Sequence, residues 1–347
     1  MGNEKISVII PVFNSMATLR PCLESVVTAI EHYGNAELIV LDNGSSDGSY
    51  EWLLRTYGRA ARIEQIPGVS ISALRNRGAA QAGGEYLSFI DSDCVVPADY
   101  FQAAMQVFRS IAADAAGCEY ELPSSPTWLE ETWHHLHWRP ADGYVPYLYS
   151  GNLLMHRAVF EGVGGFDEGL LTGEDAELGL KTTRAGYRIY RSHQIPAVHL
   201  GNPKNLGAFF RKQVWHSLGM FGSLSISALD KPLLLTFVHV ALVLLGIAGL
   251  LWAPCGLWLR LAGFLLVTSL APLATVLHRS VQRGGLYRPF RSLLLYHVYF
   301  AARAYALLLL AIGGRAASLR QHRKYGGARA ASRPAPSEAE TTKGAQE

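Results

Sequence analysis

The stretch Gly84-Glu85-Tyr86-Leu87-Ser88-Phe89-Ile90-Asp91-Ser92-Asp93 decides the fold. Its apolar run Tyr86–Ile90 predicts a short buried strand. The strand leads directly into Asp91 and Asp93. Two carboxylates at i and i+2 beyond a strand end can share one divalent cation, and such hard oxygen ligands suit Mg²⁺ or Mn²⁺. An ordinary turn has the same pattern, so both interpretations stay open for this pair taken alone.

The chain before this strand alternates strand-like and helix-like patterns, and Gly83 and Gly84 end the last helix. In chain order we expect strand Ile6–Val12, helix Leu19–Ile30, strand Glu37–Leu41, strand Ile63–Ile66 and helix Ser72–Ala82. Repeated βαβ units predict an α/β fold class, with a mostly parallel central sheet covered by helices on both faces.

Polar residues follow the ends of these predicted strands. Asn14 follows the first, Asp42 the second, and Asp91 and Asp93 the strand at Tyr86–Ile90. Ligands of open α/β sheets bind beyond the carboxyl ends of the strands. The sequence therefore predicts a ligand site at this edge.

The back of the chain has a different composition. Residues 1–231 carry 18 Lys and Arg against 25 Asp and Glu, whereas residues 232–347 carry 13 against 3. Hydrophobic residues make up 49% of the whole chain, and the mean hydropathy of +0.12 is high for a wholly soluble protein. We therefore expect a soluble catalytic part followed by a basic membrane region.

Two charge-poor apolar segments, about 232–252 and 257–277, are long enough to cross a bilayer as a helical hairpin. A third, 292–313, contains His297 and Arg303, and a central Arg costs roughly 2.5–3.5 kcal/mol on insertion scales. This segment either spans the membrane or lies at its interface. The boundaries predicted are a catalytic domain at 1–225, a membrane region at 226–315, and a basic, then disordered tail at 316–347.

The arginines that follow the hairpin favour the cytoplasmic side of the membrane. The start of the chain does not resemble a signal peptide. We therefore expect a multi-pass protein of the cytoplasmic (inner) membrane, with its catalytic domain facing the cytoplasm.

Further candidates lie between the two parts. Glu174 and Asp175 open a helical pattern, so they either cap that helix or supply a general base. His199 follows a strand-like run and either completes a metal site or is structural. Arg211 lies in a basic and aromatic segment that holds phosphates, rests on the membrane, or does both. The histidines of 133–138 lack the i, i+4 spacing of a helical metal site, so aromatic contact with sugar or lipid is favoured.

Several function classes lack their motifs. The chain has no Walker A sequence, no G-x-G-x-x-G after a strand, no G-x-S-x-G and no H-E-x-x-H. The basic excess lies beside apolar spans, which favours lipid contact over nucleic-acid binding.

The ordered motifs of residues 5–220 resemble glycosyltransferase family 2, the inverting enzymes with a GT-A fold. The motifs that carry this resemblance are Val8–Asn14, Asp42–Asp47, Arg75–Gly78, Gly84–Asp93, Gly164–Glu168 and Gly173–Asp175. It implies a nucleotide-diphospho-sugar transferase domain that binds Mg²⁺ or Mn²⁺.

The resemblance also implies roles for single residues. Asp175 would be the catalytic base and Glu174 its support, while Asp93, Asp91 and His199 would hold the metal. The nucleotide-sugar site would contain Pro11, Phe13, Asn14, Asp42, Arg75, Asn76, Asp91, Ser92 and Arg211. Phe13 would lie against the base, which Asp42 would hydrogen-bond, with uracil the commonest case.

The resemblance has one informative departure, because the Q-x-x-R-W motif of processive synthases is missing at Gln213-Val214-Trp215. We therefore expect a single sugar to pass from a UDP-sugar or similar donor to a membrane-associated, lipid-linked acceptor in surface-polysaccharide or glycolipid synthesis. The alternatives are a catalytically degenerate nucleotide-sugar-binding or scaffold relative and, with less support, a transporter.

Overall fold

A computed structural model describes residues 4–137, 141–170, 172–222 and 231–326. The strands are β1 Ile6–Val12, β2 Ala36–Asp42, β3 Arg62–Gln65, β4 Tyr86–Ile90, β5 Cys94–Val95, β6 Ala115–Gly117, β7 Gly143–Tyr144, β8 Asn152–His156, β9 Ile189–Arg191 and β10 Val198–His199. The helices are α1 Met16–Tyr33, α2 Ser49–Tyr57, α3 Ile71–Gln81, α4 Tyr100–Ser110, α5 Trp128–His137, α6 Arg157–Gly162, α7 Glu174–Arg184, α8 Leu206–Gly222, α9 Lys231–Trp252, α10 Leu257–Arg283 and α11 Pro289–Gly326.

The main sheet has the order β3-β2-β1-β4-β8-β6-β9-β7 in the described residues. The first four strands are parallel, β8 is antiparallel to both β4 and β6, and β9 is again parallel to β6. This confirms the predicted α/β fold with its mostly parallel centre. The strand at Tyr86–Ile90 has the predicted bounds.

The sequence of β1 explains why it lies inside the sheet. All seven of its residues are buried, as expected for a strand with helices on both faces. Ile6, Val8 and Ile10 pack on the side of α1 and α4, while Ile9 packs on the side of α3. Helix α3 comes so close that a Cβ on Gly78 would lie 2.5 Å from Ile9 Cγ2. Glycine is therefore required at this contact.

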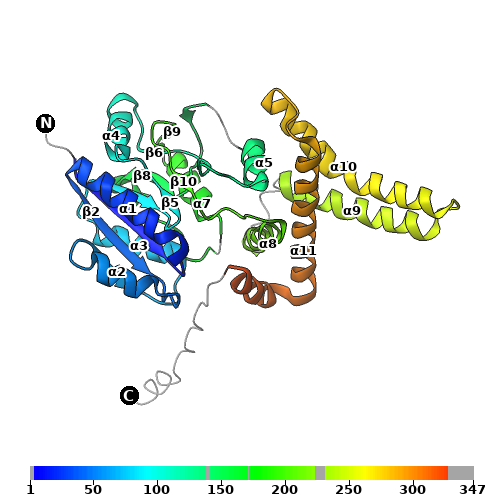
Figure 1. Ribbon diagram of the computed structural model, residues 1–347, viewed down its shortest axis with the longest axis horizontal. Helices are drawn as coiled ribbons and strands as arrows, with labels where there is room; N and C mark the ends of the chain where they lie inside the picture. The colour runs from blue at the N-terminus through cyan, green and yellow to red at the C-terminus, as the bar shows by residue number, and fades with distance from the viewer. Residues whose placement is uncertain (1–3, 138–140, 171, 223–230, 327–347) are drawn as a thin grey trace, which may run out of the picture.

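The described part of the back of the chain is helical, and three of its helices are long and apolar enough to cross a membrane: Leu233–Trp252, Leu257–Arg283 and Pro289–Ile312. Figure 1 shows α9 and α10 side by side as a hairpin that points away from the sheet. Helix α11 runs across the foot of this hairpin, beside α5 and α8. It continues to Gly326, past the boundary predicted at 315, whereas the boundary predicted at 225 lies outside the described residues.

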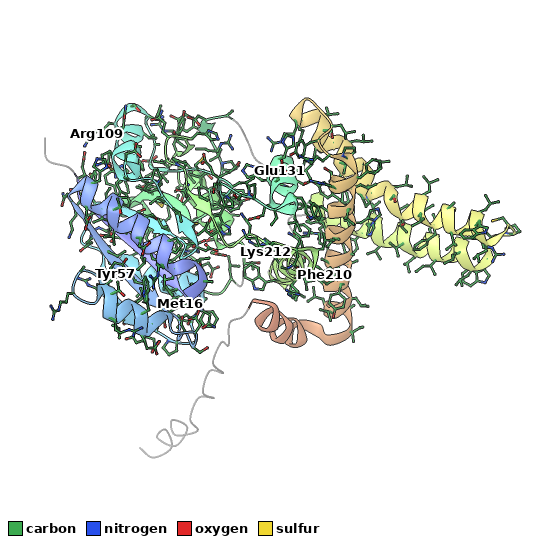
Figure 2. The ribbon with its side chains drawn as sticks, in the orientation of Figure 1. Met16, Tyr57, Arg109, Glu131, Phe210 and Lys212 are labelled. Atoms are coloured by element: carbon green, nitrogen blue, oxygen red, sulfur yellow. The ribbon has the colours of Figure 1, made fainter. Side chains whose placement is uncertain are left out.

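Helix α8 connects the sheet with the apolar helices, because one of its faces packs on α9 and α11 and another on α5 and α11. Phe210, Val214 and Leu218, at helical spacing, pack with apolar residues of α9 and α11. Phe209 packs instead with residues of α5 and α11. Figure 2 labels Lys212 and Phe210 on α8 between the sheet and α11. Helix α8 therefore packs on the apolar helices α9 and α11 and also faces the sheet.

Candidate active site

A cavity of about 790 Å³ lies beyond the carboxyl ends of β1 and β4, between the sheet and helices α5, α7 and α8. Nine of the residues predicted for the site line it. They are Pro11, Phe13, Arg75, Asp91, Ser92, Asp93, Glu174, Asp175 and His199. These nine residues share one cavity, but Asn14 and Asp42, two of the four polar residues on which the predicted edge site rests, do not line it. The assignment of the site therefore stays a prediction.

A buried arginine connects the two acidic motifs. Arg75 donates from Nη2 to Asp91 Oδ1 at 2.7 Å and from Nη1 to Glu174 Oε1 at 3.0 Å. Its Nη1 also lies 3.8 Å from Asp175 Oδ1. The guanidinium packs over the ring of Phe166. Because the Arg75 side chain is only 3% exposed, these charges interact with little screening by water.

Asp93 and His199 form a second pair, with Asp93 Oδ2 3.3 Å from His199 Nε2. Burial raises the pKa of Asp93 and lowers the pKa of His199, in each case against the attraction of the other group. The neutral imidazole is the form that binds metals. Glycines make room here, because a Cβ on Gly201 would collide with the Asp93 carboxylate and one on Gly151 with that of Asp91.

This donor set fits Mg²⁺ or Mn²⁺, since it offers carboxylate oxygens beside a neutral imidazole. His199 Nδ1 is buried and has no hydrogen-bond partner among the described residues. Asp91 is more constrained, because Arg75 and the Tyr120 hydroxyl, 3.4 Å away, both donate to its carboxylate. No group of three His, Cys, Asp or Glu in the described residues has metal-binding geometry. Asp93 and His199 are thus the stronger candidates.

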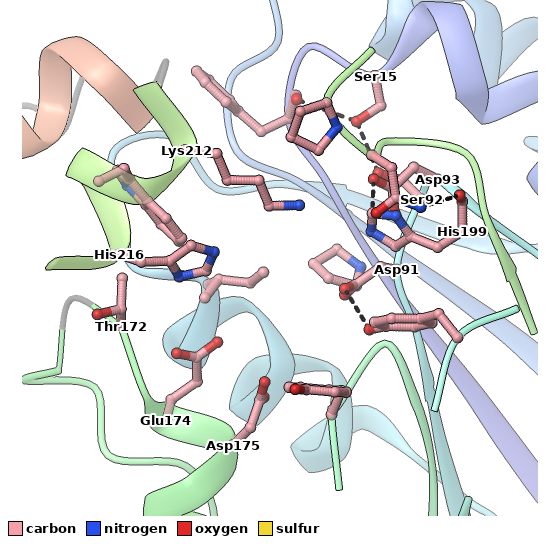
Figure 3. A pocket seen from close by; sticks show the side chains of 18 of the residues that line it. Ser15, Asp91, Ser92, Asp93, Thr172, Glu174, Asp175, His199, Lys212 and His216 are labelled. Carbon is pink, nitrogen blue, oxygen red and sulfur yellow. Dashed lines mark hydrogen bonds and ion pairs between the residues drawn. The ribbon is translucent and has the colours of Figure 1, made fainter. Parts of the chain in front are cut away.

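Asp175 lies in the first turn of α7 and faces the cavity from the wall opposite the metal candidates, as Figure 3 shows. The Ser150 hydroxyl donates to its Oδ1. Burial and the neighbouring Glu174 charge raise the pKa of Asp175 to about 7, although Arg75 opposes this shift. A carboxylate with a pKa near neutrality can accept a proton from a bound hydroxyl.

Four predicted residues do not line the cavity. Asn14 accepts from the backbone N–H of Ser46, and Asp42 accepts from the N–H groups of Gly44 and Ser45. Asn76 of α3 donates to the carbonyl of Phe166 and accepts from its N–H, in the loop before α7. These three organise the loops around the site, whereas Arg211 is exposed on α8. Their assignment to the nucleotide site stays a prediction.

The structure adds lining residues that were not predicted from the sequence. Lys212, rather than Arg211, points from α8 into the cavity, one turn from His216 (Figure 3). Burial lowers the Lys212 pKa, and the nearby Asp93 and Asp91 oppose this effect. The Tyr120 ring lies 4.7 Å from that of His199. The i, i+3, i+7 spacing of Phe209, Lys212 and His216 places them on one face of a helix. The sequence alone does not show that this face meets the cavity.

The histidines of α5 are engaged in packing and hydrogen bonding. His134 Nε2 is 3.1 Å from the carbonyl of Tyr120, and His137 Nδ1 is 2.9 Å from that of Trp133. His135 stacks on Tyr287. His134 and His137 both line the cavity, and aromatic contact of this segment with sugar or lipid stays a prediction.

The chain has relatives among glycosyltransferases. It is 28% identical over 217 residues to the glycosyltransferase AglE of Haloferax volcanii, a match that covers 60% of this chain and 70% of AglE. It is 25% identical over 217 residues to the succinoglycan biosynthesis protein ExoA of Rhizobium meliloti, which covers 59% of this chain and 66% of ExoA.

The fold has a solved counterpart in a mannosyltransferase of Pyrobaculum calidifontis, with a TM-score of 0.57 and 17% identity over 88% of this chain and 87% of that one. The family described as Glycosyl transferase family 2 matches residues 7–164, and Glycosyl transferase family group 2 matches residues 86–315. The second match covers well over half of the sequence and runs from the catalytic motifs into the apolar helices, so the chain belongs to glycosyltransferase family 2.

Proposed function

We propose that the chain is an inverting transferase that moves a sugar from a nucleotide-diphosphate sugar, with UDP favoured, to a hydroxyl of a membrane-associated, lipid-linked acceptor. One observation carries this proposal. A single cavity has the Asp93 and His199 pair on one wall, Asp175 on another, and α8 as a third. Because α8 packs on α11, an acceptor at the bilayer surface lies beside the catalytic carboxylates.

The donor fits the strand-end side of the cavity. Phe13 and Asn43 line the region for the nucleoside, and the buried Asp42 behind them keeps one carboxylate oxygen free of hydrogen bonds within the described chain. Asp93 and His199 would hold Mg²⁺ or Mn²⁺, which supplies positive charge to the donor diphosphate. The Lys212 ammonium faces the same carboxylates and adds a second positive charge.

The acceptor reacts from the Asp175 side. Asp175 removes the proton from the acceptor hydroxyl, whose oxygen forms a bond to the anomeric carbon. The bond from that carbon to the diphosphate breaks, and its electron pair leaves with the nucleoside diphosphate. Attack opposite the leaving group inverts the anomeric configuration, and no covalent intermediate with the protein is required.

The membrane attachment follows from the helices. We propose that α9 and α10 cross the bilayer and that α11 lies at the cytoplasmic interface, since it runs across the foot of the hairpin. Arg303 of α11 is turned inward and donates from Nε to Thr236 Oγ1 at 2.8 Å. This contact lowers the cost of placing a charged residue near hydrocarbon.

The relatives agree with this assignment as far as their names go. ExoA is named for succinoglycan biosynthesis, and the Pyrobaculum mannosyltransferase was solved in complex with GDP-Man and Mn²⁺. A role in polysaccharide or glycolipid assembly is therefore our proposal for this chain, and metal use rests on its own Asp93 and His199.

The test is transfer of labelled sugar from a panel of UDP-, GDP- and dTDP-sugars to extracted membrane lipid, with and without Mn²⁺. We expect one donor to label a lipid in a Mn²⁺-dependent reaction. Asp175→Asn should lower the rate about 10²- to 10⁴-fold, the range of general-base catalysis, while donor binding is retained.

Glu177→Gln is the matched control. Glu177 lies on the same helix, pairs with Lys181 and does not line the cavity. Its variant should keep the parental rate. An Asp175→Asn protein as active as the parent would instead favour a site in which another group is the base.

A further inference from the structure

Few lysines and arginines line the cavity. Among the described residues these are Arg75 and Lys212 alone. Arg75 is already engaged by Asp91 and Glu174. The carboxylates that stabilise the Lys212 charge are Asp93 and Asp91, so this cation belongs with the donor diphosphate.

The rest of the cavity is rich in aromatic rings. Trp133 of α5, Trp215 of α8 and Tyr149 all line it, together with the imidazoles of His134 and His137 and the carboxylates of Glu119 and Glu130. Burial lowers the pKa of His137 to about 4, so its ring is uncharged at physiological pH. Lys204, on the adjoining loop, is not part of the lining and pairs with Glu130.

Tyr149 is the aromatic residue most directly connected to the base. Its neighbour Ser150 donates to Asp175. One face of the Tyr149 ring stacks on Tyr120, with the ring centroids 5.7 Å apart, and the side chain is 44% exposed. An apolar ring face beside a pair of carboxylates suits the C–H face and the hydroxyl groups of a sugar.

A phosphate acceptor would meet unfavourable charges at this end. It would bring negative charge beside Glu174 and Asp175, whose neighbouring cation Arg75 is already shared with Asp91, and like charges in a poorly solvated site repel strongly. A phosphate oxygen is also already deprotonated, so it needs no base. A base with a pKa near neutrality is useful only to a hydroxyl.

We infer that the acceptor group is a hydroxyl of a neutral saccharide ring, bound against the Tyr149 ring beside Asp175, and not the phosphate of a lipid monophosphate. The acceptor is then a lipid that already carries a sugar, and the reaction makes a glycosidic bond. A preceding reaction must attach that first sugar to the lipid. This inference rests on the proposed function and specifies its acceptor.

The decisive measurement is the chemistry of the labelled lipid product. Labelled donor is incubated with the full-length protein and a total lipid extract, and the product is treated with mild acid. Such treatment cleaves sugar–phosphate bonds and leaves glycosidic bonds intact. We expect the label to be released in a disaccharide or a longer oligosaccharide. Release as a free monosaccharide would place the label directly on phosphate. It would overturn the inference and the acceptor hydroxyl of the proposed function, while sugar transfer to a membrane lipid would stand.

A lack of any labelled lipid, with donor binding intact, would instead contradict the proposed function and the inference together. The two failures are therefore distinguishable in one experiment.

Substitutions at Tyr149 supply an independent test. Tyr149→Ala should raise the KM for the lipid acceptor about tenfold and leave the donor KM unchanged, whereas Tyr149→Phe keeps the ring and should restore most of the affinity. Tyr144→Ala is the control, because Tyr144 is 56% exposed and does not line the cavity. A donor KM that rises as much as the acceptor KM would contradict an acceptor site here.

Discussion

In the proposed function, the two ends of the cavity recognise ligands by different physical means. At the donor end, Arg75, Asp91, Asp93 and Lys212 form a group of buried or half-buried charges with ion pairs as short as 2.7 Å. At the acceptor end, α5 and α8 present aromatic rings, and the His137 imidazole is uncharged at physiological pH. A metal-bound diphosphate would be matched by charge, and a sugar ring by shape and stacking.

The ends also differ in what holds them in place. At the donor end, Asp91 and Asp93 lie on a loop of one sheet, whose strands are hydrogen-bonded to each other, whereas Lys212 reaches it from α8. The α5 and α8 walls depend on helices that pack on α11. Apart from the contribution of Lys212, donor binding should therefore tolerate changes at the membrane, while acceptor use should be sensitive to them.

The largest effect is expected at Arg75, on which the donor end depends. Arg75→Met leaves the carboxylates of Asp91, Glu174 and Asp175 without their buried cation. Loss of one partner from a buried charged group costs about 3–5 kcal/mol. We expect a corresponding fall in unfolding free energy, measured by chemical denaturation in detergent, and loss of transfer.

Arg77→Met on the same helix is the matched control. Arg77 is 54% exposed and pairs with the partly exposed Glu64, so its loss should leave the unfolding free energy nearly unchanged. Equal destabilisation by both substitutions would show that the Arg75 network does not organise the site.

A smaller effect is expected from substitution of Lys212, which faces the cavity from α8. Lys212→Met removes a cation from the donor end, and a hydrogen bond to a charged group is worth about 1.5–3 kcal/mol. Affinity for the nucleoside diphosphate should fall about 10- to 100-fold, as measured by calorimetry with Mn²⁺ present.

Arg211→Met, one residue away, should leave this affinity unchanged, because Arg211 is exposed and lies outside the cavity. If Arg211→Met alone lowered this affinity, Arg211 would belong to the nucleotide-sugar site, as predicted from the sequence. Helix α8 would then have to rotate when the donor binds.

The two ends also differ in how well they could be predicted from the sequence. The buried strands β1 and β4 are continuous apolar runs, and the polar residues just beyond them could be placed at one edge without knowing any contact. The short strands β6 and β9, three residues each, carry too little pattern to be recognised. The antiparallel strand β8 was also not predicted.

The acceptor end could not be derived in the same way. Helix α8 is apolar or aromatic on more than one face, because it contacts α5, α9 and α11 besides the cavity. The choice between Arg211 and Lys212 is a rotation of about 100° on that helix, and only packing determines it. For the same reason the tryptophans near residue 133 could be recognised as aromatic contacts but not assigned to a wall of the site.

The smallest effect concerns Asp175, where the two ends meet. Its raised pKa of about 7 means that the carboxyl is protonated below neutrality and cannot accept a proton from the acceptor. The turnover rate should therefore fall about tenfold for each pH unit below 7 and level off above it. Burial and the charges of Glu174 and Asp91 all raise this pKa, so Glu174→Gln removes the larger of the two charge effects. The acid limb of the rate profile should then move to lower pH, while Glu177→Gln leaves it in place. A limb that stays at the same pH in Glu174→Gln would assign the titration to another group, and the difference in charge between the two ends would no longer explain how the base is tuned.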